Sequence, residues 1–268
     1  MSKKSTLVML FALIAFGVAQ AQNNRLNTQN TIGWYNYFGT IKCSSKTSVH
    51  TEYQWRRDHL ISTWQQSLLR VGVNHSLNPR VLLRAGYAWV ETFAYGEFPI
   101  HAMGRNFTEH RVYEMVQLSH KEERVEFTHR FMLEQRFVGR YSSPNAATED
   151  AFPMLNRLRY MVRLQVPLKG NDLKDHTPYA AAYNEIFIGF GKNVQSNVFD
   201  QNRMAILLGY QFNKHVKIEG GYLHQILQFG RQINGRNVFQ NNKGLILNTY
   251  ITLDFSRKHE PTSGGAQN

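Results

Sequence analysis

Arginine and glutamate side chains alternate with apolar ones along two long stretches of the sequence. Between 124 and 136 the even positions carry mostly Arg and Glu, while the odd ones include Val125, Phe131 and Leu133. Between 155 and 168 the odd positions from 157 to 165 carry Arg, Arg, Met, Arg and Gln, opposite Leu, Tyr and Val. Successive side chains of a β-strand point to opposite faces, so this spacing predicts two strands with one ionic and one apolar face. Such a face can form ion pairs, and its planar guanidinium groups can bind anions.

The same alternation extends over most of the chain, although Glu114 and Asn184 interrupt it. Further strands are expected near 31–41, 46–56, 62–74, 80–92, 107–119, 178–190, 201–212, 215–230 and 244–255. The expected charge network on the ionic face comprises Glu52, Arg56, Arg70, Arg84, Glu109, Arg111, Arg124, Glu126, Arg130, Glu134, Arg136, Arg157, Arg159, Arg163, Glu185, Arg203 and Glu219. Arg outnumbers Glu in this set, so the face is predicted to be cationic. Most Lys residues fall instead at turns or strand ends.

The length of these segments separates the two folds that alternation allows. Strands of a soluble sandwich have about 5–6 residues, whereas a strand that crosses a membrane needs roughly 9–11. Most segments here exceed ten residues. An apolar face in lipid and an ionic face in the lumen also reconcile 17 Phe, 13 Tyr and 4 Trp with a mean hydropathy of −0.43. The sequence therefore predicts an all-β fold, an antiparallel transmembrane β-barrel over residues 32–255.

The number and spacing of the segments refine this prediction. Eleven can be counted, but bacterial single-chain barrels usually have an even number of strands. We expect about twelve strands, with ten as the alternative. Short turns near 44–45, 76–78, 120–121 and 213–214 alternate with long connections near 94–105, 138–154, 191–200 and 231–242. Barrels of this class have short periplasmic turns and long outer loops.

The N-terminus predicts the compartment. Lys3 and Lys4 precede an apolar run from Leu7 to Val18, and a small-x-small pattern ends at Ala21. This is the pattern of a cleaved signal peptide over residues 1–21. We expect an N-terminal segment at 22–31, the barrel, and a polar tail at 256–268. The predicted location is the cell outer membrane, where lipid and lipopolysaccharide would surround the barrel.

Catalytic, cofactor and metal sites are not expected. None of the eleven His residues is followed two positions later by Ser, the pair that outer-membrane lipid hydrolases use as base and nucleophile. The acidic pair Glu149 and Asp150 has no His beside it, and Glu109 and His110 point to opposite faces of a strand and cannot chelate together. Export argues against a nucleic-acid partner, although the chain has a formal charge of +12.

Two classes of function remain for a cationic lumen. In the first, Arg and Glu fill the lumen and the barrel is a non-enzymatic scaffold or binding protein, whose protein partner the sequence does not identify. In the second, the lumen is a narrow pore or transporter that prefers anionic solutes, as rings of Arg do in anion pores. An outer-membrane hydrolase that acts on lipid stays as a further alternative.

Short motifs add a resemblance to a known family. They are Glu109-His110-Arg111, Glu134-Gln135-Arg136-Phe137, Arg157-Leu158-Arg159-Tyr160, Val166-Pro167-Leu168, Tyr183-Asn184-Glu185, Phe199-Asp200-Gln201-Asn202-Arg203, and Gly221-Tyr222 followed by Gln225. In this order they resemble the domain of unknown function 2490 family over roughly residues 32–255. The resemblance implies a Gram-negative outer-membrane barrel of the type common in Bacteroidetes, and it implies no particular activity.

Overall fold

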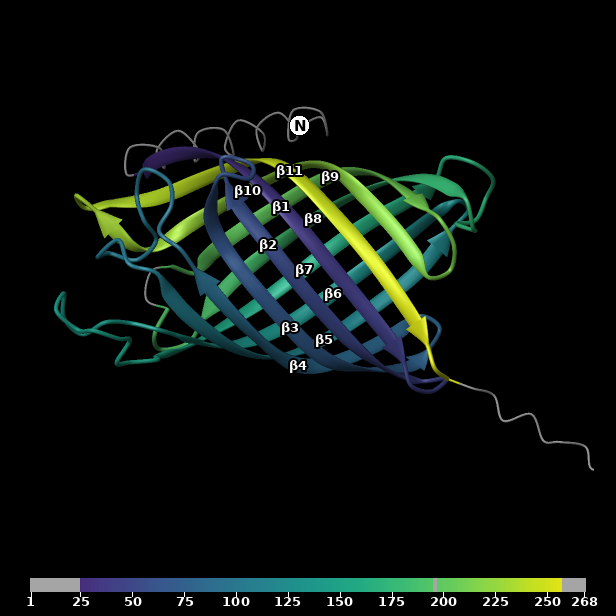
Figure 1. The fold of residues 1–268 in the computed structure, drawn as a ribbon, viewed down its shortest axis with the longest axis horizontal. Helices are drawn as coiled ribbons and strands as arrows, with labels where there is room; N and C mark the ends of the chain where they lie inside the picture. Colours follow the sequence, from purple (N-terminus) through teal and green to yellow (C-terminus); the bar gives the residue numbers. More distant parts are fainter. Residues whose placement is uncertain (1–24, 195–196, 257–268) are drawn as a thin grey trace, which may run out of the picture.

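The computed structural model describes residues 25–194 and 197–256, and within them eleven strands form a closed barrel (Figure 1). The strands are β1 (Arg25–Lys42), β2 (Thr47–Asp58), β3 (Thr63–Asn78), β4 (Val81–Thr92), β5 (Phe107–Glu122), β6 (Val125–Val138), β7 (Met154–Pro167), β8 (Thr177–Phe190), β9 (Phe199–Gln211), β10 (Val216–Ile233) and β11 (Arg236–Asp254). The described part of the chain contains no helix that is long and apolar enough to span a membrane.

The barrel closes between its first and last strands. All other neighbours pair antiparallel, and an odd number of alternating strands makes the closing pair parallel, from Arg25 beside Asn237 to Lys42 beside Asp254. The start of β1 and the end of β11 therefore lie at opposite ends of the barrel (Figure 1). The predicted all-β barrel is confirmed. The described chain has eleven strands, one fewer than the predicted number of about twelve.

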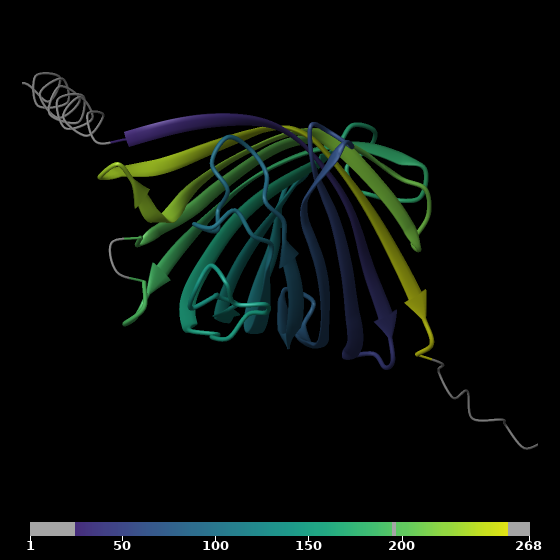
Figure 2. The same cartoon turned by 60° about the vertical axis from the view of Figure 1, so that its left-hand side comes forward.

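The two ends of the barrel carry different connections. One end, here called the turn end, has the connections 43–46, 79–80, 123–124, 168–176 and 212–215. The other end, here called the mouth, has 59–62, 93–106, 139–153, 191–198 and 234–235. At the mouth, β1, β10 and β11 continue beyond the neighbouring strands, because the first residues of β1 pair with β11 but not with β2 (Figure 2).

The hairpin of β10 and β11 corrects the expected long connection at 231–242. Strand β10 continues to Ile233 and β11 starts at Arg236, so only Asn234 and Gly235 connect them. Both residues have positive φ, 50° and 71°, as the Asn-Gly hairpin turn requires. Strand β1 also starts at Arg25, within the expected N-terminal segment. The predicted signal peptide at 1–21 and the tail beyond residue 256 lie outside the described residues.

Burial alternates along the strands as the sequence predicts. In β9, Ala205 and Leu207 are 0% and 1% exposed, whereas Met204, Ile206 and Leu208 are 39%, 60% and 67% exposed. Outward positions of the other strands carry large apolar side chains in the same way. Inside the barrel, inward positions of β1 and β8 to β11 form an apolar cluster of Ile32, Trp34, Tyr179, Ala181, Ala205, Leu207, Leu223 and Ile246.

Two inward tyrosines lie directly over glycines of other strands: Tyr179 of β8 over Gly209 of the adjacent β9, and Tyr113 of β5 over Gly72 of β3. A Cβ atom at Gly209 would lie 2.2 Å from Cζ of Tyr179, and one at Gly72 would lie 2.5 Å from the hydroxyl of Tyr113. Both tyrosines are fully buried. Glycine at these positions therefore allows the rings to fill the lumen close to the backbone.

The two polar residues that interrupt the alternation lie on exposed positions of the wall. Glu114 of β5 accepts a hydrogen bond from Gln135 of β6 at 3.3 Å. Asn184 of β8 and Asn202 of β9 exchange two hydrogen bonds of 3.0 and 3.1 Å. Each of these side chains therefore has a partner on the adjacent strand.

Candidate functional site

Fifteen of the seventeen charged residues predicted for the lumen are buried or half-buried on β2 to β10. They are Glu52, Arg56, Arg70, Arg84, Glu109, Arg111, Arg130, Glu134, Arg136, Arg157, Arg159, Arg163, Glu185, Arg203 and Glu219. A buried charge is costly unless it is paired. Each of the five glutamates in this set accepts a hydrogen bond from at least one Arg.

Arg124 and Glu126 are corrections to that prediction. Arg124 lies in the turn between β5 and β6, is exposed, and donates to the carbonyl of Pro167 at 2.8 Å. Glu126 is also exposed and accepts a hydrogen bond from Gln165 at 3.3 Å. Alternation assigns a side chain to a face of the sheet, but it does not show where the strand leaves the lumen.

Glu134 of β6 is the centre of an ion-pair network that crosses the lumen. It accepts hydrogen bonds from Arg157 Nε at 2.8 Å and Arg159 Nη1 at 2.7 Å, both on β7. It also lies 3.7 Å from Arg70 of β3, which pairs in turn with Glu52 of β2 at 2.7 Å. Because β4 and β5 separate β3 from β6 in the wall, the contact between Glu134 and Arg70 passes through the interior.

Aromatic rings and guanidinium groups form a stack beside this network. The Cζ atoms of Arg56 and Arg203 lie 4.0 and 4.9 Å from the ring centre of Trp34. The Cζ atoms of Arg203 and Arg159 both lie 4.5 Å from the ring centre of Phe187. The stack runs from β2 through β1, β9 and β8 to β7, strands on opposite sides of the barrel. We call the side chains of the network and the stack the belt: Trp34, Glu52, Arg56, Arg70, Glu134, Arg157, Arg159, Phe187 and Arg203.

Further ion pairs lie on the turn-end side of these residues. Glu185 of β8 pairs with Arg130 at 2.8 Å. Glu219 of β10 pairs with Arg163 at 2.6 Å and accepts from the hydroxyls of Tyr179 and Tyr250 at 2.9 and 2.8 Å. These contacts again join strands that are not neighbours, such as β7 and β10.

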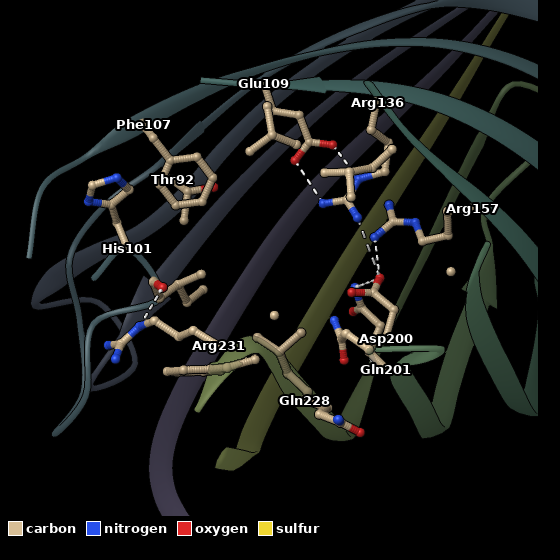
Figure 3. A pocket seen from close by; sticks show the side chains of 18 of the residues that line it. Thr92, His101, Phe107, Glu109, Arg136, Arg157, Asp200, Gln201, Gln228 and Arg231 are labelled. Atoms are coloured by element: carbon tan, nitrogen blue, oxygen red, sulfur yellow. Dashed lines mark hydrogen bonds and ion pairs between the residues drawn. The ribbon is translucent and has the colours of Figure 1, made fainter. Parts of the chain in front are cut away.

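A cavity of 450 Å³ opens between the belt and the connections of the mouth (Figure 3). We call it the mouth pocket. On one side Arg136 pairs with Glu109, and Arg157 with Asp200; on the other lie His101, Phe107 and Arg231 (Figure 3). Its volume is typical of sites for small molecules, roughly 300–1,000 Å³.

Three β-bulges at the mouth direct side chains into this pocket. Gln65 of β3 and Asp200 of β9 are the extra residues at two register shifts, and 229–231 lie in the third, on β10. All of them line the pocket. Bulges are frequent at barrel rims and beside functional sites, where they re-aim side chains. Because a bulge breaks the period of two, alternation did not identify Gln65 or Asp200 as inward residues.

The connection 93–106 forms a roof over the pocket. The hydroxyl of Tyr95 donates to Gln240 of β11 at 2.7 Å, and both side chains are buried. Arg231 of β10 donates to the carbonyls of Pro99 and Ile100 at 2.7 and 3.3 Å. The roof therefore joins β4 and β5 to β10 and β11, across the mouth.

His101 of the roof carries a shifted pKa. Burial, followed by the nearby cations Arg105 and Arg231, lowers the pKa of His101 below its ordinary value of 6.5. The imidazole is thus neutral at pH 7, and the roof carries no charge at this position. Among the described residues, no group of three His, Cys, Asp or Glu side chains is arranged to hold a metal ion.

Trp34, Phe187, Tyr95 and Gln240 are further site residues that the sequence did not single out. Trp34 lies in a segment with irregular alternation, and its indole donates to Gln65 at 2.7 Å. Tyr95 belongs to a long connection, where no periodic signal exists. Their common property, contact across the lumen, arises only when the sheet closes.

Residues 31–235 match the model of one protein family, described as protein of unknown function (DUF2490). No curated protein matches the chain. The family match includes every residue of the belt and of the lining of the mouth pocket, from Trp34 to Arg231, and ends before β11. It covers well over half of the 268 residues, so the chain belongs to the DUF2490 family.

Proposed function

We propose that this protein is an outer-membrane β-barrel with a closed lumen, and that it works as a non-enzymatic binding barrel or scaffold through its mouth. The contact of Glu134 with Arg70 across the lumen, beside the stack on Trp34 and Phe187, carries the proposal. The residues of the belt contact one another across the lumen, and Arg157, Glu134 and Phe187 are at most 2% exposed.

The outer surface supports the location. Leu69 and Val71 of β3, Leu158 of β7 and Leu245 of β11 are 44–54% exposed, among many similar side chains. A soluble monomer rarely exposes an apolar surface that is continuous around the molecule. In an outer membrane, lipid and lipopolysaccharide would cover it, with the short connections in the periplasm and the roof outside.

The belt carboxylates also support a role without catalysis. Glu134 and Glu52 are held by guanidinium groups, and a carboxylate engaged in this way is a poor base. A scaffold or binding role uses the same ion pairs as a rigid floor beneath the mouth pocket.

Electrical recording on planar bilayers tests the closed lumen. We expect no current above background from the folded full chain. A double variant, Trp34→Ala with Phe187→Ala, should open the stack and produce current, whereas Trp89→Ala with Phe131→Ala, which removes exposed rings, should not. Reproducible anion-selective current from the unaltered protein, lost in Arg130→Ala or Arg159→Ala, would establish a pore instead.

Cell fractionation tests the location. The protein should be recovered with the outer membrane and should remain there after washing at high salt, because apolar burial does not depend on ionic strength as surface charge does. Recovery in the soluble periplasm would contradict the proposal.

A further inference from the structure

We propose that the mouth pocket binds a small organic phosphate, with the phosphate at Arg56 and Arg203 and an apolar body beneath the roof. This inference rests on the closed lumen, since the belt is the floor on which the ligand would lie. Three features of the pocket support this ligand: an excess of positive charge, unused hydrogen-bond donors and an apolar lining.

The lining of the pocket has an excess of positive charge. Among the described residues it contains seven Arg, namely Arg56, Arg111, Arg136, Arg140, Arg157, Arg203 and Arg231, and only two carboxylates, Glu109 and Asp200. Both carboxylates are already engaged, Glu109 with Arg111 and Arg136, and Asp200 with Arg157. Of the remaining cations, Arg56 and Arg203 are buried, and an anion bound beside them would offset the cost of burying their charge.

Arg203 is the clearest of the unused donors. The residue is 8% exposed, and its Nε donates to Gln201 at 3.0 Å. Within the described part of the chain, Nη1 and Nη2 of Arg203 donate to no other group. The guanidinium also lies over the rings of Trp34 and Phe187, contacts that do not use its in-plane N–H groups.

Arg56 provides a second cation on the same indole ring. It donates only to the neutral amides of Gln54 and Gln66, and no carboxylate of the described residues lies within 4.0 Å of it. The Cζ atoms of Arg56 and Arg203 are at most 8.9 Å apart, the sum of their distances of 4.0 and 4.9 Å to the centre of Trp34. Both residues line the mouth pocket, where a phosphate would accept charge-assisted hydrogen bonds of about 2.8 Å from each guanidinium.

The rest of the pocket suits an apolar body. Towards the roof it is lined by Ile100, Met103, Phe107, Leu155, Leu227 and Phe229. A phosphate dianion matches the excess of cations better than a carboxylate, and it offers more acceptors to two guanidinium groups. The volume of 450 Å³ admits a body of one or two rings or a short chain.

Titration calorimetry of the full chain in a nonionic detergent tests the inference with phenyl phosphate as the probe. We expect binding at one site, about ten-fold weaker binding of inorganic phosphate and benzoate, and no binding of phenol. Sulfate should compete with phenyl phosphate in the unaltered protein, a measurement that needs no variant. Equal binding of phenol, or no effect of sulfate, would overturn the inference.

Three variants locate the site. Arg203→Gln and Arg56→Gln should each weaken phenyl phosphate by about ten-fold or more, because each removes a charge-assisted contact. Arg124→Gln, the same change at the exposed turn end, should leave the affinity unchanged. Undiminished affinity in both pocket variants would refute the site. If neither variant folds, the competition by sulfate in the unaltered protein tests the inference instead.

Dihexanoyl phosphatidic acid, a soluble short-chain lipid, distinguishes the source of the phosphate. If this lipid competes with phenyl phosphate and binds more tightly, the natural ligand is a lipid headgroup. If it binds more weakly, the natural ligand is a free phosphate ester. Both outcomes support binding of an organic phosphate. The inference and the proposed function fail separately. If planar bilayers show no current and phenyl phosphate does not bind, only the inference about the ligand is refuted. If the unaltered protein carries current, the proposal of a closed lumen is refuted.

Discussion

The carboxylate of Glu134 on β6 lies 3.7 Å from the guanidinium of Arg70 on β3, with β4 and β5 between them in the wall. Glu134 also holds Arg157 and Arg159, and its side chain is completely buried. One carboxylate thus compensates cations that reach it from two sides of the barrel.

Glu134→Gln should therefore destabilise the folded barrel strongly. The substitution leaves Arg157 and Arg159 buried with less compensation, and removing one partner of a buried ion pair costs about 3–5 kcal/mol. Urea unfolding of the protein in lipid vesicles measures the change in the free energy of unfolding. The matched substitution Glu122→Gln, at an exposed position of β5, should stay within about 0.5 kcal/mol. Equal midpoints for the two variants would contradict the central role of Glu134.

Gly209→Ala should also destabilise the barrel. The added Cβ would lie 2.2 Å from the ring of Tyr179, which is fully buried and cannot move outward through the wall. Overpacking of this kind costs about 1–3 kcal/mol. Gly230→Ala is the control, because the nearest atom to its Cβ would lie 3.9 Å away. If the same unfolding experiment gave both variants the stability of the parent, the ring of Tyr179 would not lie over Gly209.

The roof should loosen in acid through His101. Its pKa is lower in the folded roof than the value of 6.5 expected when the roof is open, so proton uptake favours opening. Stability is full above pH 6.5 and is lost as the pH falls from there to the lowered pKa. Of the charged groups around His101, Arg105, Arg231 and Arg140 oppose its protonation, and Glu149 favours it.

Hydrogen exchange of residues 93–106 checks this prediction. Exchange, corrected for its intrinsic dependence on pH, should be faster at about pH 5 than at about pH 7.5, on either side of the ordinary His pKa. His101→Gln removes the titrating group and should abolish most of the difference. A pH dependence that survives in His101→Gln would assign the effect to another group.

Much of the fold could be predicted from the sequence, because it is a local property of the strands. A period of two over more than ten residues is present in segments such as 124–136 and needs no knowledge of neighbours. The same alternation predicted that Arg157, Arg159 and Glu134 lie on the ionic face. It failed at 231–242, where Asn and Gln are frequent and only the Asn234-Gly235 turn signals a hairpin.

The site itself could be predicted only in part. Alternation predicted that Arg56 and Arg203 lie on the ionic face. At the mouth, the bulges that bring Gln65 and Asp200 inward interrupt this alternation. A bulge changes one residue in the register between two strands, and the sequence of either strand alone does not contain that register.

The sequence by itself determined that long strands separate ionic from apolar side chains and that Arg exceeds Glu on the ionic side. Tertiary structure decided the parallel closure of β1 on β11, the contact of Glu134 with Arg70, and the stack that holds Arg203 between Trp34 and Phe187. The physical reason is geometric. Alternation follows from the backbone of one strand, whereas a contact across the lumen depends on how many strands close the sheet and how they are staggered.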